Sequence, residues 1–129
     1  MAYVRPGFTG GVVMRAVLVV DDDRDILSAI QEALADEGFT VWTAGGGERA
    51  LEVLRGAELP GLVLLDGRMN GIDGSSVLSW IRADPRARGI PVVFMSADRR
   101  VVPPDGVRML PKPFDLEALI RVVGELLVG

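Results

Sequence analysis

Short apolar runs alternate along the chain with segments whose apolar residues recur at helical spacing. Five of the runs are expected to be strands, at residues 16–20, 40–44, 61–65, 91–95 and 107–110. Several are apolar at every position, as in AVLVV and GLVLL, which is typical of strands covered on both faces of a parallel sheet. Strands that alternate with helices therefore predict a doubly wound α/β domain.

Four helical segments lie between or after these strands. They are expected to begin after residue 23, after residue 47, near residue 75 and near residue 116. Gly38 is expected to end the first helix, because a glycine is the usual residue just past a helix end. The last segment has the clearest apolar stripe, and Asp115 is its expected N-cap. We expect Asp23 to cap the first helix in the same way.

Composition excludes several classes of site and of partner. The chain has no histidine, so a Ser-His-Asp triad, a histidine base and most zinc sites are excluded, and a bound metal would need oxygen ligands, as Mg²⁺ does. A formal net charge of −4 argues against direct nucleic-acid binding. There is neither a long apolar span nor a secretory signal pattern, and the lack of cysteine fits a cytoplasmic protein.

The first residues, MAYVRPGFTGGVVMR, have no sustained apolar period. We expect residues 1–14 to form a mobile N-terminal extension and residues 15–129 to form the folded domain. Met14 is a second candidate for the natural start of the chain. The chain ends soon after the last helix, so we expect either a protein without an output domain or a piece cut from a longer one.

Polar residues stand where four of the predicted strands end. They are Asp21, Asp22 and Asp23 after the first strand, Asp66 after the third, Ser96 after the fourth and Lys112 after the fifth. The carboxyl ends of parallel strands meet at one edge of the sheet, where ligands bind. If the first and third strands are neighbours, three of the carboxylates converge. Two such charges about 4 Å apart repel by roughly 4 kcal/mol, so the cluster must take up protons or bind a cation.

Lys112 is the only lysine, since the other 13 of the 14 basic residues are arginine. A lysine ammonium is a compact charge that can reach a single oxygen in a tight pocket, unlike the broad arginine fork. A hard cation beside a carboxylate, an ammonium and a hydroxyl is the set of groups that phosphoryl transfer requires.

Four motifs in this order, VLVVDDDRDI, VLLDGRMNGIDG, VVFMSA and LPKPF, resemble the receiver domain of two-component response regulators. The resemblance covers about Arg15 to Val128. It implies the flavodoxin-like (CheY-like) five-stranded sheet of order 2-1-3-4-5.

The resemblance also implies roles for the charged residues. Asp66 would accept a phosphoryl group from a phosphohistidine on a histidine kinase or phosphotransfer protein. Mg²⁺, or Mn²⁺ in its place, would be held by Asp21, Asp22, Asp66 and the backbone carbonyl of Arg68. The chain would then be a switch or a phosphorelay shuttle, and not an enzyme beyond transferring and losing its own phosphoryl group. We expect a monomer or weak dimer that binds neither nucleic acid nor membrane.

Two further roles concern the phosphoryl oxygens. The resemblance implies that Ser96 and Lys112 each bind one of them, and that the Lys112–Pro113 peptide bond is cis.

The chain departs from the family pattern between the fourth and fifth strands. Only 15 residues separate Ser96 from Lys112, and the segment 97–106 contains two prolines and a glycine. These residues predict that the family's fourth helix is shortened or missing. Met109 stands where the family has an aromatic switch residue, and Asn70 stands where proline is usual.

Arg68 and Asp98 each lie two residues after a predicted site residue. We expect both at the rim of the phosphorylation pocket. Our hypothesis is that they pair across its mouth and slow the attack of water on an aspartyl phosphate.

Two alternatives remain open. The shortened helix and Met109 also fit a degenerate receiver that binds proteins without being phosphorylated. Asp21 and Asp23 form the Asp-x-Asp pattern of small Mg²⁺ phosphohydrolases and Toprim-type domains, although Asp25 stands where the phosphohydrolases need Thr or Val.

Other polar and aromatic residues are given structural interpretations. Asp73 is interpreted as a turn residue, Trp42 and Trp80 as packing residues, and the arginines of 82–100 as solvated surface.

Overall fold

The computed structural model describes residues 11–98, 100, 102–103 and 106–127. Its strands are β1 (Gly11–Val20), β2 (Thr40–Ala44), β3 (Glu58–Asp66), β4 (Val92–Ser96) and β5 (Arg108–Pro111). All neighbouring strands pair in parallel, in the order β2-β1-β3-β4-β5. This is the predicted sheet, and the expected order is confirmed.

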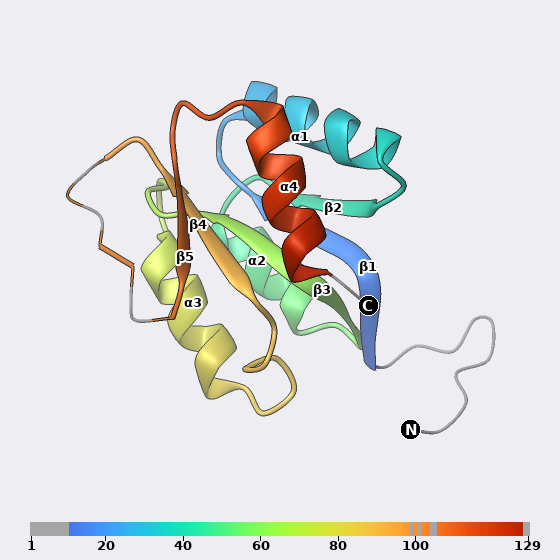
Figure 1. Ribbon diagram of the computed structural model, residues 1–129. Coiled ribbons are helices and arrows are strands. Elements are labelled where there is room, and N and C mark those ends of the chain that lie inside the picture. The colour runs from blue at the N-terminus through green and yellow to red at the C-terminus, as the bar shows by residue number, and fades with distance from the viewer. Residues whose placement is uncertain (1–10, 99, 101, 104–105, 128–129) are drawn as a thin grey trace.

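The helices are α1 (Arg24–Asp36), α2 (Gly47–Leu54), α3 (Gly74–Ala83) and α4 (Leu116–Leu126). Helices α1 and α4 cover one face of the sheet, and α2 and α3 cover the other (Figure 1). Successive residues of β1 go to opposite faces, so that Val17 and Val19 pack with α1 and α4 while Leu18 and Val20 pack with α2 and α3. Complete burial of such a side chain stabilises the fold by about 1.5–3 kcal/mol.

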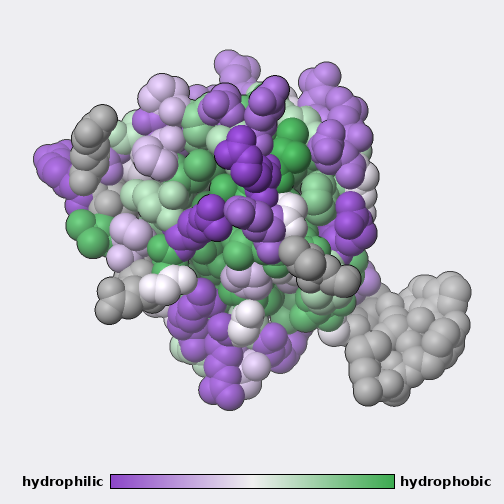
Figure 2. Space-filling view, in the orientation of Figure 1, coloured by the Kyte–Doolittle hydropathy of each residue, from purple (hydrophilic) through white to green (hydrophobic). Residues whose placement is uncertain are grey.

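Aspartates cap three of the four helices. Asp23 accepts the backbone N–H groups of Asp25 and Ile26, while Asp73 and Asp115 each accept one N–H of the first turn of α3 and α4. The two predicted caps are confirmed, and Asp73, predicted as a turn residue, is the cap of α3. Beyond its cap, α1 turns exposed polar side chains to the solvent, and the surface over this helix is hydrophilic (Figure 2). The caps fix where these helices begin relative to the strand ends.

The start of β1 corrects a prediction. Residues 11–14 belong to the strand and not to a mobile extension, and Gly11, Val12 and Val13 pair with residues 58–60 of β3. The glycines before this segment and Arg15 after it set it apart from the apolar run 16–20 in the sequence, and Val12 and Met14 are exposed although they belong to the strand. Gly61 permits the close approach, since a Cβ there would overlap the carbonyl oxygen of Met14. Residues 1–10 lie outside the described residues.

The connection between β4 and β5 contains no helix among residues 97, 98, 100, 102, 103, 106 and 107. The prediction of a shortened or missing helix is confirmed for these residues. No helix in the described part of the chain is long and apolar enough to cross a membrane.

Two arginines, one in the last turn of α3 and one just after it, have a structural role that the sequence did not suggest. Arg82 donates to the carbonyls of Arg88 and Ile90, and Arg86 donates to those of Gly56 and Ala57. These bonds tie the loop that precedes β4 to the end of α3 and to the residues just before β3. Both arginines are exposed, as predicted, but they also hold the backbone of these segments together. Trp42 and Trp80 pack against the α2 and α3 side of the core, as predicted. Arg99 lies outside the described residues.

Candidate functional site

The predicted site residues meet at the carboxyl edge of the sheet. Asp21 directly follows β1, Asp66 and Ser96 are the last residues of β3 and β4, and all three are buried. Because β1 and β3 are neighbours, one carboxylate oxygen from each of Asp21, Asp22 and Asp66 lies within 4.8 Å of the others. The expected convergence of these carboxylates is therefore present in the fold. Asp23 is not in this group, so the Asp-x-Asp pair of the phosphohydrolase alternative is not assembled.

Lys112 supplies the positive charge of the cluster. Its Nζ donates to Asp21 Oδ2 at 2.7 Å and lies 3.6 Å from Asp66 Oδ2. Only 16% of the lysine side chain and 1% of the Asp21 side chain are exposed, so solvent screens this ion pair weakly. The peptide bond between Lys112 and Pro113 is cis, as predicted.

Each of the three carboxylates also accepts one backbone N–H. Asp21 Oδ1 accepts from the Asp23 amide at 3.0 Å, and Asp66 Oδ1 accepts from the Arg68 amide at 3.1 Å. Asp22 Oδ2 accepts from the Asn70 amide at 3.1 Å. One oxygen of each group is thus fixed by the backbone, which orients the carboxylates.

Burial raises the pKa of Asp66 from 3.8 to about 6, and the neighbouring Asp21 charge adds to the increase. The Arg68 amide and the Lys112 ammonium act in the opposite direction but do not offset the burial. Three carboxylates face one ammonium here, so the ionised cluster carries excess negative charge. The oxygen ligands and the net charge of −2 left by three carboxylates and one ammonium fit a hard divalent cation such as Mg²⁺.

Ser96 is held by the backbone that follows it. Its Oγ accepts the Asp98 amide at 3.0 Å and donates to the Asp98 carbonyl oxygen at 3.5 Å. The hydroxyl therefore stands at the end of β4, on the same edge of the sheet as the carboxylates.

Arg68 and Asp98 form the pair expected at the rim, with 2.8 Å between the arginine Nη1 and Asp98 Oδ2. Arg100 is a third member that the sequence reasoning missed. Its Nε and Nη2 donate to the two oxygens of Asp98, and its backbone N–H donates to Asp98 Oδ1. The signal was local, since an aspartate often accepts the amide two residues on in a turn. These bonds, chiefly those from Arg100, lower the pKa of Asp98 to about 2.

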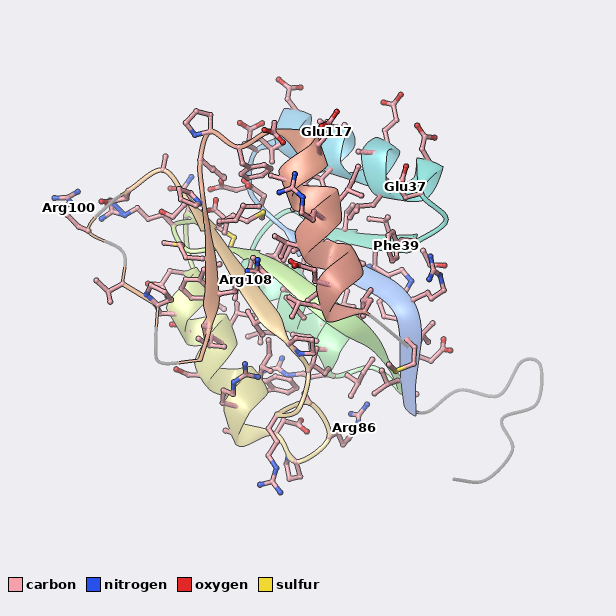
Figure 3. All side chains as sticks on the ribbon, viewed as in Figure 1. Glu37, Phe39, Arg86, Arg100, Arg108 and Glu117 are labelled. Carbon is pink, nitrogen blue, oxygen red and sulfur yellow. The ribbon has the colours of Figure 1, made fainter. Side chains whose placement is uncertain are left out.

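Arg100 lies on the loop after β4, whereas Arg86 lies beyond the end of α3, well away from this edge (Figure 3). Beside the rim is a pocket of about 430 Å³, lined by Met109 and by Val102, Pro103, Ser96 and Lys112 among others. Met109 thus contacts the space next to the site, at the position where the family has an aromatic residue.

Comparison with known proteins agrees with this geometry. The sequence model of the response regulator receiver domain family matches residues 17–124 of this chain. NtrC of Escherichia coli (strain K12), a DNA-binding transcriptional regulator, is 36% identical over 83% of this chain, which spans 24% of NtrC. The transcriptional regulatory protein PrrA of Mycobacterium tuberculosis is 38% identical over 91% of this chain, which spans 52% of PrrA. The chain thus spans a quarter to a half of these two relatives.

One relative of similar length is the probable methanogenesis regulatory protein FilR2 of Methanothrix harundinacea, 34% identical over 93% of this chain and 89% of its own. Among solved structures, a CheY-like receiver domain protein from Methanospirillum hungatei aligns with a TM-score of 0.75 and 30% identity over 87% of this chain and 93% of its own. CheY4 of Vibrio cholerae aligns with a TM-score of 0.77 at 24% identity, over 88% of this chain and 99% of its own, which supports the fold. The chain therefore belongs to the response regulator receiver domain family.

Proposed function

We propose that Asp66 is the phosphoacceptor of this receiver domain and that the domain transmits a two-component signal through it. The observation that carries the proposal is the buried cluster at the carboxyl edge, where three carboxylates face a single ammonium and Ser96 ends the next strand. The donor of the phosphoryl group is a phosphohistidine on a histidine kinase or phosphotransfer protein. The net charge of −4 supports a protein partner over direct binding to nucleic acid. We place this exchange in the cytoplasm, which the lack of cysteine fits, without direct binding to a membrane.

In the proposed reaction a carboxylate oxygen of Asp66 forms a bond to phosphorus while the P–N bond to the imidazole breaks. The bonding electron pair leaves with the imidazole nitrogen. The Lys112 ammonium and the Ser96 hydroxyl each bind an oxygen of the transferred group, whose charge is dispersed over three oxygens. Lys112 is already within 3.6 Å of Asp66, so its charge needs little displacement to reach that group.

We also propose that Asp21, Asp22, Asp66 and the backbone carbonyl of Arg68 hold Mg²⁺ or Mn²⁺. The bound cation would neutralise the charge that accumulates when a phosphoryl group approaches these carboxylates. Asp22 supports this assignment because its second oxygen accepts no hydrogen bond from the described residues. The orientation of the other carboxylates by backbone amides means that little rearrangement is needed before a cation binds.

Hydrolysis ends the signal when water attacks phosphorus and Asp66 leaves as a carboxylate, which releases inorganic phosphate. We propose that the contact between Arg68 and Asp98 narrows the path of that water. Arg100 supports the role, because its two side-chain bonds hold Asp98 in place at the rim.

A second candidate function is a degenerate receiver that binds its target without phosphorylation. Two observations favour it: the described residues between β4 and β5 form no helix, and Met109 contacts the adjacent pocket in place of an aromatic residue. A degenerate receiver would not need its carboxylates to bind a cation.

Intact-protein mass spectrometry distinguishes the two functions. The protein is incubated with Mg²⁺ and acetyl phosphate, and Asp66→Asn serves as the control. We expect the wild-type chain to gain one phosphoryl group and the variant to gain none. A wild-type protein that binds Mg²⁺ but gains no phosphoryl group from acetyl phosphate or from a histidine kinase would contradict the phosphoacceptor function, and one that binds no cation would favour the degenerate receiver.

A further inference from the structure

Asn70 makes an unusual contact for a residue of an exposed loop. Its backbone N–H donates to Asp22 Oδ2 at 3.1 Å, although the two residues are 48 positions apart in the chain. Within the described ranges this is the only hydrogen bond that joins the loop after β1 to the loop between β3 and α3. The contact therefore depends on how the two loops pack against each other.

Asp22 differs in this respect from the other two carboxylates. Asp21 and Asp66 are buried and accept an amide from two residues further along their own loops. Such local bonds form with the turn itself. Asp22 is exposed, so packing does not select its side-chain rotamer. Among the described residues, the amide of Asn70 is the only hydrogen-bond partner of the Asp22 carboxylate, so this bond is what orients it.

The side chain of Asn70 is not part of this contact. Its amide group makes no hydrogen bond to the described residues, and the residue is exposed. What the position supplies is a backbone donor, which every amino acid except proline provides. The bond occupies one oxygen of Asp22 and leaves the other available to a cation.

We propose that Asn70 is a positioning residue that acts through its backbone N–H, holding the Asp22 carboxylate in place so that the cluster binds Mg²⁺ more tightly. The inference rests on the proposed function, because it requires the cluster to be a Mg²⁺ site. Hydrogen bonds that orient metal ligands commonly change metal affinity by about 10–100-fold when they are removed. A carboxylate that is already oriented loses less rotamer freedom on binding.

The test compares two substitutions at the same position. Asn70→Pro removes the donor, whereas Asn70→Ala retains it and removes only the side-chain amide. Mg²⁺ is titrated into each protein and into the wild type, and the Kd is measured by isothermal titration calorimetry. We expect the Kd of Asn70→Ala to match that of the wild type, and the Kd of Asn70→Pro to be about tenfold weaker.

If both variants bind Mg²⁺ as tightly as the wild type, the inference is overturned and the proposed function stays intact. Equal losses in both variants would also overturn it, because the side chain and not the N–H would then be responsible. A wild-type protein without measurable Mg²⁺ affinity would overturn the inference together with the metal part of the proposed function.

A second measurement tests for the hydrogen bond without the proline substitution, since proline could also distort the loop. In the Mg²⁺-free protein the residue 70 amide proton is followed by NMR in the Asn70→Ala background, with and without Asp22→Ala. We expect the amide resonance to lie downfield while the carboxylate is present and to move upfield when it is removed. A resonance that does not move would show that the bond does not form in solution, which overturns the inference without reference to proline.

Discussion

Two neighbouring parts of the sheet edge are built in different ways. Where β1 and β3 end, Asp21 and Asp66 are buried, and Lys112 contacts Asp21 in an environment that water hardly reaches. At the rim after β4, by contrast, Asp98 contacts two arginines, Arg68 and Arg100, whose side chains are mostly exposed. Under the proposed function, we expect the buried part to determine whether Asp66 is phosphorylated and the exposed rim to adjust how fast the phosphoryl group is lost.

The largest effect is expected from removing the only ammonium of the buried part. Lys112→Met retains most of the side-chain volume but leaves Asp21 without its partner, so we expect the free energy of unfolding to fall by about 3 kcal/mol in metal-free buffer. Denaturant unfolding with a chelator present measures this change. As a matched control, Arg108→Met breaks the exposed pair with Glu125 and should change stability by less than about 1 kcal/mol. Equal losses in the two variants would remove the distinction between the buried and the exposed charges.

Asp66→Asn should stabilise the metal-free protein. The folded pKa of Asp66 is about 6, above its ordinary value of 3.8, so the ionised carboxylate destabilises the fold above pH 6. At roughly 1.4 kcal/mol per pKa unit, the variant should gain about 2–3 kcal/mol at pH 7.5. The gain should shrink as the pH falls from 6 towards 4, because the wild-type carboxyl then takes up a proton. Unfolding curves across this pH range check the prediction, and a pH-independent difference would contradict it.

The exposed part should affect rates more than stability. In the double variant Arg68→Ala, Asp98→Ala, we expect the phosphorylated protein to lose its phosphoryl group a few-fold faster, because water reaches the pocket more easily. Loss of the labelled aspartyl phosphate over time provides the rate. Arg49→Ala, which breaks the exposed pair with Glu52 on α2, is the control. If the double variant and the control decay at the same rate, the rim pair has no role in limiting water.

The smallest effect is the response to salt. At 1 M ionic strength the Debye length is about 3 Å, so the exposed contact between Arg68 and Asp98 should weaken while the buried contact of Lys112 persists. Wild-type dephosphorylation should then accelerate towards the rate of the double variant, whose own rate should change little. A wild-type rate that is insensitive to salt would indicate that the rim contact is held by packing and not by charge.

The features that sequence patterns predicted correctly are those that depend on neighbours in the chain. Asp23 and Asp115 were identified as caps because a cap bonds to amides two or three residues away. The strands were found because each apolar run is short and bounded by polar residues. Asp66 and Ser96 could be assigned to one edge because every parallel strand ends on the same side of the sheet.

The features that were missed depend on distant partners. Residues 11–13 form a strand because the start of β3 pairs with them, and this pairing partner is more than 40 residues away in the chain. Arg86 bonds to carbonyls 29 and 30 residues away, which no local spacing indicates. Asn70 contacts Asp22 through a backbone group, and a backbone group is the same in almost every amino acid.

The sequence by itself therefore determined the kind of fold, the edge where the charged groups gather and the chemistry that those groups can perform. These follow from residue type and short-range spacing, which act through local hydrogen bonds and the burial of apolar side chains. Only the tertiary structure decided that the Asn70 amide reaches Asp22, that Lys112 lies nearer to Asp21 than to Asp66, and that Arg68 contacts Asp98. Those details depend on distances between loops, and such distances are established only when the whole sheet and its helices pack.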